Sequence, residues 1–544
     1  MKNNGTSTKK QDSSIALKGL SLSVLTLGSR VLGLIREMTK AHFLGTSSQS
    51  DAFSIAFLVP NLFRRLFAEN SISVAFIPTF KTYLKDNETP EDRQTTQEFI
   101  SATITLLCFL VTTFVVLCMF LTPLILRIFY GFKKFDFDSF SEAVILTRMM
   151  FPYLVVISIA AFFQGILNGV KIFSPSGFTP ILFNGIVIAF TYIFAPHTAN
   201  PARAMAIGVV TGGTVQALFR LPFVLKTKWT VSFTSLKNAF TNPGTRRVLK
   251  LVAPTIVGMA AYQLNDIFST SIANRVNEGL VSSLQYSLRL QELILGIFAV
   301  TIGTVILPDL TGFAKQKKWE DFNKMLTNAL KIMILISIPV TAYCIIMKRS
   351  LVATLFATGR FNENSIETTT AVFHFHIIGL VFIALNRILS PSFYAQEDAV
   401  SPTLAGIINV AVNVVLAYAL SIPMGGNGIA LALSIASAVN TVILFVLLLR
   451  KKDVDSKHIS LSSGLYALKI AVFSIIAAVP VYFVREPLLN FFAGHNRWIS
   501  YGCPVAVSGI IFAIVGVILL LITKDPIISP LVKKAAGIVK ARSK

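Results

Sequence analysis

Long apolar runs alternate with short polar segments along almost the whole chain. A helix needs about 20 mostly apolar residues to cross roughly 30 Å of hydrocarbon, and about fourteen runs are long enough. The predicted spans are 16–34, 51–75, 99–127, 143–168, 178–196, 203–225, 248–273, 280–308, 325–347, 367–390, 401–423, 427–449, 462–484 and 498–523. The pattern therefore predicts an all-α polytopic membrane protein with about 14 transmembrane helices.

An internal repeat divides these spans. VPNLFRRLFAENSISVAFIPTF, ending at Phe80, is matched by LRLQELILGIFAVTIGTVILPDL, ending at Leu310, so that Pro78 and Pro308 correspond. Repeats of this kind are typical of transporters whose substrate binds between two halves. They predict two pseudo-symmetric six-helix lobes and two appended helices. The predicted division is a tail at 1–15, lobes at 16–225 and 248–450 joined by a basic linker at 226–247, an appended pair at 451–523, and a basic tail at 524–544.

Composition agrees with a membrane protein, because 53% of the 544 residues are hydrophobic and 14% are charged, against about 25% charged in soluble domains. The net charge of +23 falls mainly in short loops on one side of the predicted spans. That asymmetry predicts both termini in the cytoplasm and argues against nucleic-acid binding. The four cysteines form no CxxC pair and the six histidines are scattered, so we expect no metal site.

Charged residues interrupt the apolar stretch 50–80, which holds Asp51, Arg64, Arg65 and Glu69. An ionisable group at the bilayer centre costs about 2.5–3.5 kcal/mol, so such groups normally face protein or a water-filled cavity. Arg65 and Glu69 have the i, i+4 spacing of a helix-supporting pair. Arg64 is offset from them by about 100° and has no obvious local partner at that spacing.

Further arginines lie in the first and eighth spans. Arg30 and Arg36 are in or just after the first, and Arg289 is in the eighth, where Glu292 has the i, i+3 spacing of a local pair. Arginine keeps its charge in almost any environment and holds phosphate through two hydrogen bonds. We therefore predict a cationic cavity between the lobes that suits an anionic head group such as a pyrophosphate. Local pairing of Arg289, and extension of Arg36 toward the membrane surface, are the alternatives.

Four stretches carry a family resemblance: SRVLGLIRE (29–37), SDAFSIAFLVPNLFRRLFAENSISVAFIP (50–78), MFPYLVVISIAAFFQGILN (150–168) and YSLRLQELILGIFAVTIGTVILP (286–308). They are similar to the bacterial lipid II flippase family, MurJ/MviN, of the MOP exporter superfamily. The resemblance implies a flippase of the bacterial inner membrane that carries lipid-linked peptidoglycan precursor, lipid II, from the inner to the outer leaflet by alternating access. It implies substrate-binding roles for Arg30, Arg36, Asp51, Arg64 and Arg289, with Glu292 as local counter-ion where the usual neighbouring acid is replaced by Leu288.

The resemblance also bears on energy and partners. Some relatives resemble sodium-binding exporters, and the matching ion-binding candidates are Asp266, Asn409 and Asn413. Coupling to Na⁺ or to the membrane potential is therefore expected, and no organic cofactor is. No GxxxxGK[ST] motif appears, so ATP hydrolysis is not expected. The implied partners are lipid II, membrane lipids and cell-wall synthesis or division proteins.

Two other functions remain open. Another MOP-type exporter, for drugs or polysaccharide-linked lipids, would share the spans and the repeat but should lack the arginine block. A membrane transferase acting on a polyprenyl phosphate would be an enzyme, and it would normally cluster acids around a divalent cation. Asp51, Glu69, Asp266 and Glu292 are too dispersed in the sequence to predict that cluster. A transporter is therefore favoured over an enzyme.

Overall fold

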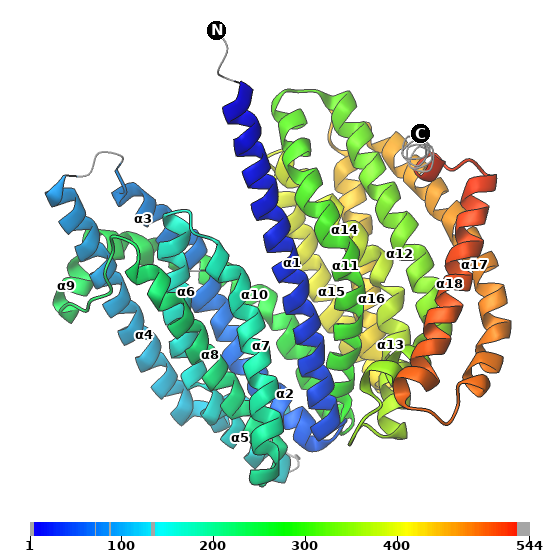
Figure 1. Ribbon diagram of the computed structural model, residues 1–544, viewed down its shortest axis with the longest axis horizontal. Coiled ribbons are helices and arrows are strands. Elements are labelled where there is room, and N and C mark those ends of the chain that lie inside the picture. The colour runs from blue at the N-terminus through cyan, green and yellow to red at the C-terminus, as the bar shows by residue number, and fades with distance from the viewer. Residues whose placement is uncertain (1–4, 71, 86–88, 132–136, 530–544) are drawn as a thin grey trace. The chain divides into compact units, whose positions relative to one another are not determined.

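The computed structural model describes residues 5–70, 72–85, 89–131 and 137–529, with side chains at all of these except 5–24, 69, 70, 73, 254, 255, 257–262, 297–305 and 307. Helices make up nearly all of this part of the chain, and it contains no strand (Figure 1). The chain forms two compact units, Met1–Ser282 and Ser283–Lys544. The prediction of an all-α fold is confirmed.

The first unit is built from apolar helices joined by short turns. Its elements are α1 (Gly5–Leu44), α2 (Ser48–Phe63), η1 (Arg64–Asn70), η2 (Ile72–Phe76), α3 (Ile77–Tyr83), α4 (Pro90–Tyr130), α5 (Phe137–Met150), α6 (Pro152–Gly169), α7 (Ser174–Phe194), η3 (Ala195–His197), α8 (Pro201–Leu225), α9 (Leu236–Thr241) and α10 (Pro243–Val276). Helix starts follow from local sequence: Thr89 and Asp92 form a capping box before α4, and α6, α8 and α10 begin with proline.

The second unit continues with α11 (Leu280–Lys315), α12 (Trp319–Phe356), α13 (Glu363–Ile378), α14 (Leu380–Ala395), α15 (Val400–Met424), α16 (Gly426–Leu449), α17 (Ser456–Phe491), η4 (Trp498–Gly502) and α18 (Cys503–Ile522). Gly425, with φ of 56°, makes the turn between α15 and α16, a backbone conformation that favours glycine. Helix α17 packs against α12 and α18. The lobe limits predicted from the repeat remain a prediction, and α10 packs against α4 and η2 within the first unit.

Nine helices of the described residues are long and apolar enough to cross a membrane, and α13 with α14, bent by 40°, makes a tenth if the pair is one span. The four other predicted spans, 16–34, 51–75, 248–273 and 280–308, also fall on helices: α1, the run from α2 to η2, α10 and α11. These four carry the charged residues singled out above. The structure thus agrees with a polytopic membrane protein, and the number 14 remains a prediction.

The helix that begins as α2 widens after its proline. Pro60 lies inside α2, and the next segments, η1 and η2, are π-helical before α3 resumes the α-helical form. A proline removes one backbone hydrogen bond and bends a helix, and π-helical turns occur frequently at functional sites. Arg64 and Arg65 are the first two residues of η1, so the break places both arginines where the helix changes form.

Aromatic rings fill the core of the first unit. Phe76, Phe80, Phe99, Phe162 and Trp229 are fully buried in one cluster. Helix α6 approaches these rings closely because it presents glycines: a Cβ on Gly165 would lie 2.8 Å from Phe76, and one on Gly169 would lie 2.5 Å from Phe80. The glycines therefore set how near α6 lies to η2 and α3.

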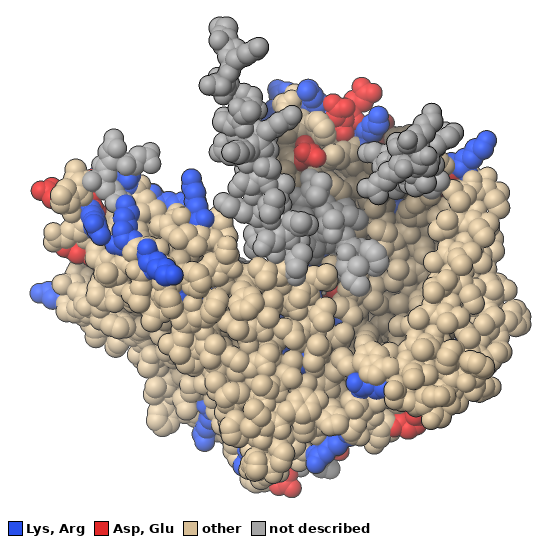
Figure 2. Space-filling view, in the orientation of Figure 1, with Lys and Arg blue, Asp and Glu red and all other residues tan. Residues whose placement is uncertain are grey.

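Charged side chains are scarce along the helix bodies and gather near their ends, as Figure 2 shows for one face. In the second unit, the segment after α18 is tied to α17 by Asp525, which is fully buried and accepts hydrogen bonds from Lys469 (2.8 Å) and the Tyr466 hydroxyl (3.2 Å). Burial opposes ionisation of this carboxyl, but the bonds from Lys469 and the Ile527 backbone outweigh it and hold the pKa of Asp525 below its usual range. The charge of Lys469 is therefore satisfied within the protein.

Candidate functional site

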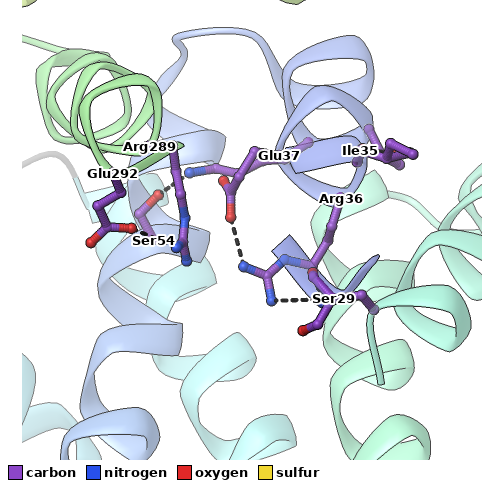
Figure 3. A network of polar contacts seen from close by, with 10 residues as sticks. Ser29, Ile35, Arg36, Glu37, Ser54, Arg289 and Glu292 are labelled. Carbon is purple, nitrogen blue, oxygen red and sulfur yellow. Dashed lines mark hydrogen bonds and ion pairs between the residues drawn. The ribbon is translucent and has the colours of Figure 1, made fainter. Parts of the chain in front are cut away.

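Arg36 on α1 is held on both sides. Its Nη2 donates to Glu37 Oε1 at 2.7 Å and its Nη1 to Asn184 Oδ1 on α7 at 3.2 Å. The Asn184 amide in turn donates to the Ser29 carbonyl at 3.3 Å. Figure 3 shows the guanidinium extending between Glu37 and the backbone around Ser29. Because 13% of the Arg36 side chain is exposed, extension toward the membrane surface is wrong as its explanation: the arginine turns into the first unit.

Arg30 lies on the same helix and is partly buried. The sequence places it two turns before Glu37, on the same helix face. In the structure Glu37 is nevertheless the ion-pair partner of its neighbour Arg36. Helix α1 therefore supplies one arginine fixed by an acid and an amide, and a second one nearby that no described ion pair engages.

Arg64 and Arg65, at the start of η1, have different partners. Arg64 Nε donates to the Asn61 side-chain oxygen at 2.9 Å, one turn earlier. This neutral amide at i, i−3 was not predicted as a partner of Arg64, and the expectation that Arg64 lacks an acid at helical spacing stays a prediction. Arg65 Nη1 reaches α10, where it lies 3.2 Å from Gln263 Oε1 and 3.4 Å from Asp266 Oδ2. Its predicted partner Glu69 has a side chain outside the described part of the chain.

Asp51, near the start of α2, belongs to a buried polar cluster. Its carboxylate accepts a hydrogen bond from the Ser282 backbone N–H at 2.8 Å, and 2% of the residue is exposed. Lys40, equally buried, donates to Ser54, and the Ser282 hydroxyl donates to Ser50 at 2.8 Å. A buried charge needs such partners. The structure gives Asp51 a clear packing role, and its predicted contact with substrate remains a prediction.

Arg289 and Glu292 form the predicted pair on α11 in the second unit. Arg289 Nη1 donates to Glu292 Oε2 at 2.8 Å, and the two side chains remain 45% and 59% exposed (Figure 3). An exposed pair of this kind contributes little to stability, about 0–1 kcal/mol. The i, i+3 pairing is thus confirmed, and it leaves both charged groups accessible within their unit.

The opposite face of the same helix is anchored. The Ser287 hydroxyl lies 2.7 Å from His376 Nδ1, and the Gln291 side chain donates to the His376 carbonyl. All three residues are buried. His376 lies in the last turn of α13, just before the bend into α14. These contacts fix the turns of α11 that carry Arg289.

The ion-binding candidates are divided between the units. Asp266, in the first unit, already faces Arg65. Asn409 and Asn413, in the second, share one face of α15, with Asn413 buried and Asn409 partly buried. Among the described residues no group of three or more His, Cys, Asp or Glu could hold a metal ion. The Na⁺ site remains a prediction.

Three neutral polar residues hold the candidate site in place and were not predicted to do so from the sequence. Asn184, Gln263 and His376 each hold a predicted residue or its helix, and each comes from a different helix far along the chain. Asn184 interrupts an otherwise apolar stretch, which is the one signal that the sequence offers for it. The amides of Asn184 and Gln263 orient guanidinium groups that an acid also engages, Glu37 at Arg36 and Asp266 at Arg65.

Comparison with known proteins gives consistent matches. Residues 40–502 match the family model of lipid II flippase MurJ. The chain is 44% identical over 521 residues to a probable lipid II flippase MurJ of Treponema pallidum, covering 95% of this chain and 97% of the relative. It is 33% identical over 442 residues to a lipid II flippase MurJ of Burkholderia cenocepacia, covering 80% and 84%.

Solved structures agree in fold. A structure of "Lipid II flippase MurJ, inward closed conformation" superposes with a TM-score of 0.75 at 24% identity, covering 93% of this chain and 99% of the other. An inward-facing multidrug resistance MATE transporter of the MOP superfamily superposes with a TM-score of 0.66 at 16% identity, covering 80% and 96%.

Proposed function

This chain belongs to the MurJ family of lipid II flippases, and we propose that it carries lipid II from the inner to the outer leaflet of the bacterial inner membrane by alternating access. The family is one of transporters rather than of enzymes. In this proposal the chain binds the head group in one orientation and releases it in the other. Both termini lie in the cytoplasm, as the distribution of Lys and Arg in the loops favours.

The observation that carries the proposal is how two arginines are held. Arg36 is oriented by Asn184, and Arg64 by Asn61. These amides fix the direction of each guanidinium, and Arg36 is also ion-paired with Glu37 at 2.7 Å. A guanidinium has five N–H donors, so an oriented arginine can still offer donors to the paired oxygens of a pyrophosphate. We propose that Arg30, Arg36, Arg64 and Arg289 contact the pyrophosphate, and that Arg65, held by Asp266, supports the helix break.

Energy for the cycle would come from outside the chain's own chemistry. Moving one charge through a potential of 100 mV is worth about 2.3 kcal/mol. In this proposal an inside-negative potential draws the unloaded cationic site back toward the cytoplasm after release. Asp266, Asn409 and Asn413 are the candidates for Na⁺ coupling. Because Asp266 is paired with Arg65, its binding of Na⁺ would require that pair to separate.

The test replaces Arg64 by Gln and by Lys in cells that depend on this protein, and measures lipid II exposed on the outer face. Arg64→Gln removes the charge, so exposure should fall at least tenfold. Arg64→Lys keeps the charge and loses the planar fork, so the fall should be smaller. Arg485→Gln is the matched control, since this arginine stacks on Tyr482 in α17. Normal exposure in a stably produced Arg64→Gln protein would contradict the proposed role.

A further inference from the structure

The last turn of α13 is held by a side chain from α11. Helices α13 and α14 meet at Gly379 with a bend of 40°. A bend in a membrane helix frees backbone carbonyl groups, which side chains of neighbouring helices commonly satisfy. The Gln291 side chain on α11 donates a hydrogen bond to the His376 carbonyl in the turn before the bend. This bond therefore joins α11 to the bend itself.

Helix α16 fixes the same turn from another side. The Ser434 hydroxyl donates to the Phe375 carbonyl at 2.6 Å. Gly379 lies so close to this serine that a Cβ on the glycine would be 2.5 Å from the hydroxyl oxygen and 2.9 Å from the Ser434 Cα. Close packing of this kind leaves no space for a shift at the bend. The bend is therefore a tightly packed joint of the second unit.

A second bond links α11 to the same residue of α13. The Ser287 hydroxyl lies 2.7 Å from Nδ1 of His376, so the two bonds from α11 end on the ring and on the carbonyl of one histidine. Ser287 and Gln291 are one turn apart and share a face of α11. Ser287, Gln291 and His376 are 0%, 3% and 2% exposed. A slide or rotation of α11 against α13 would break both bonds where water cannot replace them, which is costly.

Arg289 lies between these two anchors, on the other side of α11. It is two residues from each of them, about 200° around the helix, and 45% of its side chain is exposed. A helix is stiff over one turn because backbone hydrogen bonds join residues four positions apart. Anchoring Ser287 and Gln291 thus sets the height of Arg289 along the helix and the direction in which its side chain extends. The arginine is placed from the opposite face of its own helix.

We propose that the two bonds on His376 position Arg289 for lipid II: they hold α11 on the bend and so set where the guanidinium meets the pyrophosphate. Ser287, Gln291 and His376 are then positioning residues, buried on the far face of α11 and not in contact with the substrate. This inference rests on the proposed function, in which Arg289 contacts the pyrophosphate. A displacement of about 1 Å in a positioned group can cost about 100-fold in rate, so these bonds act on transport as well as on stability.

The test measures the dissociation constant of lipid II for the purified full-length protein as wild type, Gln291→Met, Arg289→Gln and the double variant. Gln291→Met keeps the side-chain volume and removes the donor. The His376 carbonyl keeps its bond from the Gly379 N–H at 3.1 Å, so the protein should fold. Loss of one hydrogen bond corresponds to about a fivefold change in an equilibrium constant. Gln291→Met should therefore weaken lipid II binding by that factor when Arg289 is present, and not at all in Arg289→Gln.

The two backgrounds separate positioning from general support. A residue that only stabilises the fold lowers affinity by the same factor in both, whereas a residue that acts through Arg289 shows coupling between the two changes. Equal factors, with binding weakened by Arg289→Gln itself, would overturn the inference and leave the proposed function standing. Wild-type affinity in Arg289→Gln would overturn both, since there would be no guanidinium contact to position.

The bond to the histidine ring has its own pair of variants. His376→Leu removes the partner of Ser287, whereas His376→Asn keeps a polar atom near the place of Nδ1. Both leave the backbone carbonyl that Gln291 uses. His376→Leu should weaken lipid II binding only when Arg289 is present, and His376→Asn should restore it. Equal losses in the two variants would overturn the role of this bond.

Ser508→Ala is the matched control in the same unit. The Ser508 hydroxyl is buried and lies 3.1 Å from the Tyr343 hydroxyl, so it joins α18 to α12 and takes no part in the bonds of α11. This change should leave lipid II affinity as in the wild type, with and without Arg289. A loss in Ser508→Ala equal to that in Gln291→Met would show that affinity follows the stability of the unit, and would overturn the inference.

Discussion

Two changes at Asn184 separate an anion-binding role of Arg36 from a structural one. Asn184→Leu removes the amide that accepts from Arg36 at 3.2 Å and donates to the Ser29 carbonyl at 3.3 Å. Asn184→Asp keeps an acceptor at the same place and adds a negative charge. If Arg36 only supports the fold, the aspartate should be tolerated at least as well as asparagine. If Arg36 binds a phosphate, the aspartate should be the more harmful change.

The expected sizes follow from the contacts. A hydrogen bond to a charged group contributes about 1.5–3 kcal/mol, and the 3.2 Å distance favours the lower end, so Asn184→Leu should reduce transport about tenfold. A new carboxylate about 6 Å from a phosphate charge adds about 3 kcal/mol of repulsion at an effective dielectric constant of about 20. Asn184→Asp should therefore reduce transport by about 100-fold. Glu37 still pairs with Arg36 in both variants, so both should fold.

The assay measures lipid II exposed on the outer face of cells that contain each variant as their sole copy, with membrane levels of the protein measured in parallel. Asn386→Leu is the matched control, because that amide donates to the Ser437 carbonyl and accepts from Thr441 within the second unit and contacts no arginine in these bonds. Transport in Asn184→Asp equal to or above that in Asn184→Leu would refute the anion-binding role.

Three further outcomes are expected. Arg65→Ala should lower both thermal stability and transport. If the pair with Asp266 is what supports the helix break, the exchange Arg65→Asp with Asp266→Arg should restore both. Thermal stability that stays low in the exchanged protein would contradict the pairing. Asp398, between α14 and α15, is partly buried, but bonds from Lys451 and Ser401 lower its pKa to about 2. Its contribution to the free energy of unfolding should therefore stay constant down to about pH 4 and be lost as the pH falls toward 2. A loss of stability between pH 7 and 5 that Asp398→Asn abolishes would contradict this lowered pKa. Gly165→Val should lower the free energy of unfolding by about 1–3 kcal/mol through overpacking, and with it the thermal midpoint. Gly185→Val, with open space at its Cβ, should lower neither.

Hydrophobic patterning predicted the fold well because apolar length is a direct physical requirement of the bilayer. Every predicted span falls on a helix of the structure. The four spans at 16–34, 51–75, 248–273 and 280–308 are not recognised by hydropathy and charge alone, because they carry the arginines and acids of the candidate site. The widening of the helix at Arg64 was not predictable from spacing, because a π-helical turn depends on the packing of its neighbours as well as on the preceding proline.

Local spacing predicted one ion pair and missed the others. Arg289 with Glu292 follows the i, i+3 rule. Arg65 also reaches Asp266, some 200 residues away, which its spacing could not predict; its predicted pair with Glu69 involves a side chain outside the described part of the chain. Arg36 takes an acid next to it and an amide from α7. Such partners are chosen by helix packing, which a single sequence does not encode in any short window.

The π-helical segments after Phe63 also mean that the number of residues in this stretch decides which way its side chains face. A π-helical turn is equivalent to one residue inserted into an α-helix, and one residue rotates all that follows by about 100°. Arg65 faces α10, and Phe76 and Phe80 face α6. The angle between these two faces depends on the number of residues that separate them and not on side-chain chemistry. Deleting a single residue between them would preserve every side-chain type that matters and still point one set the wrong way.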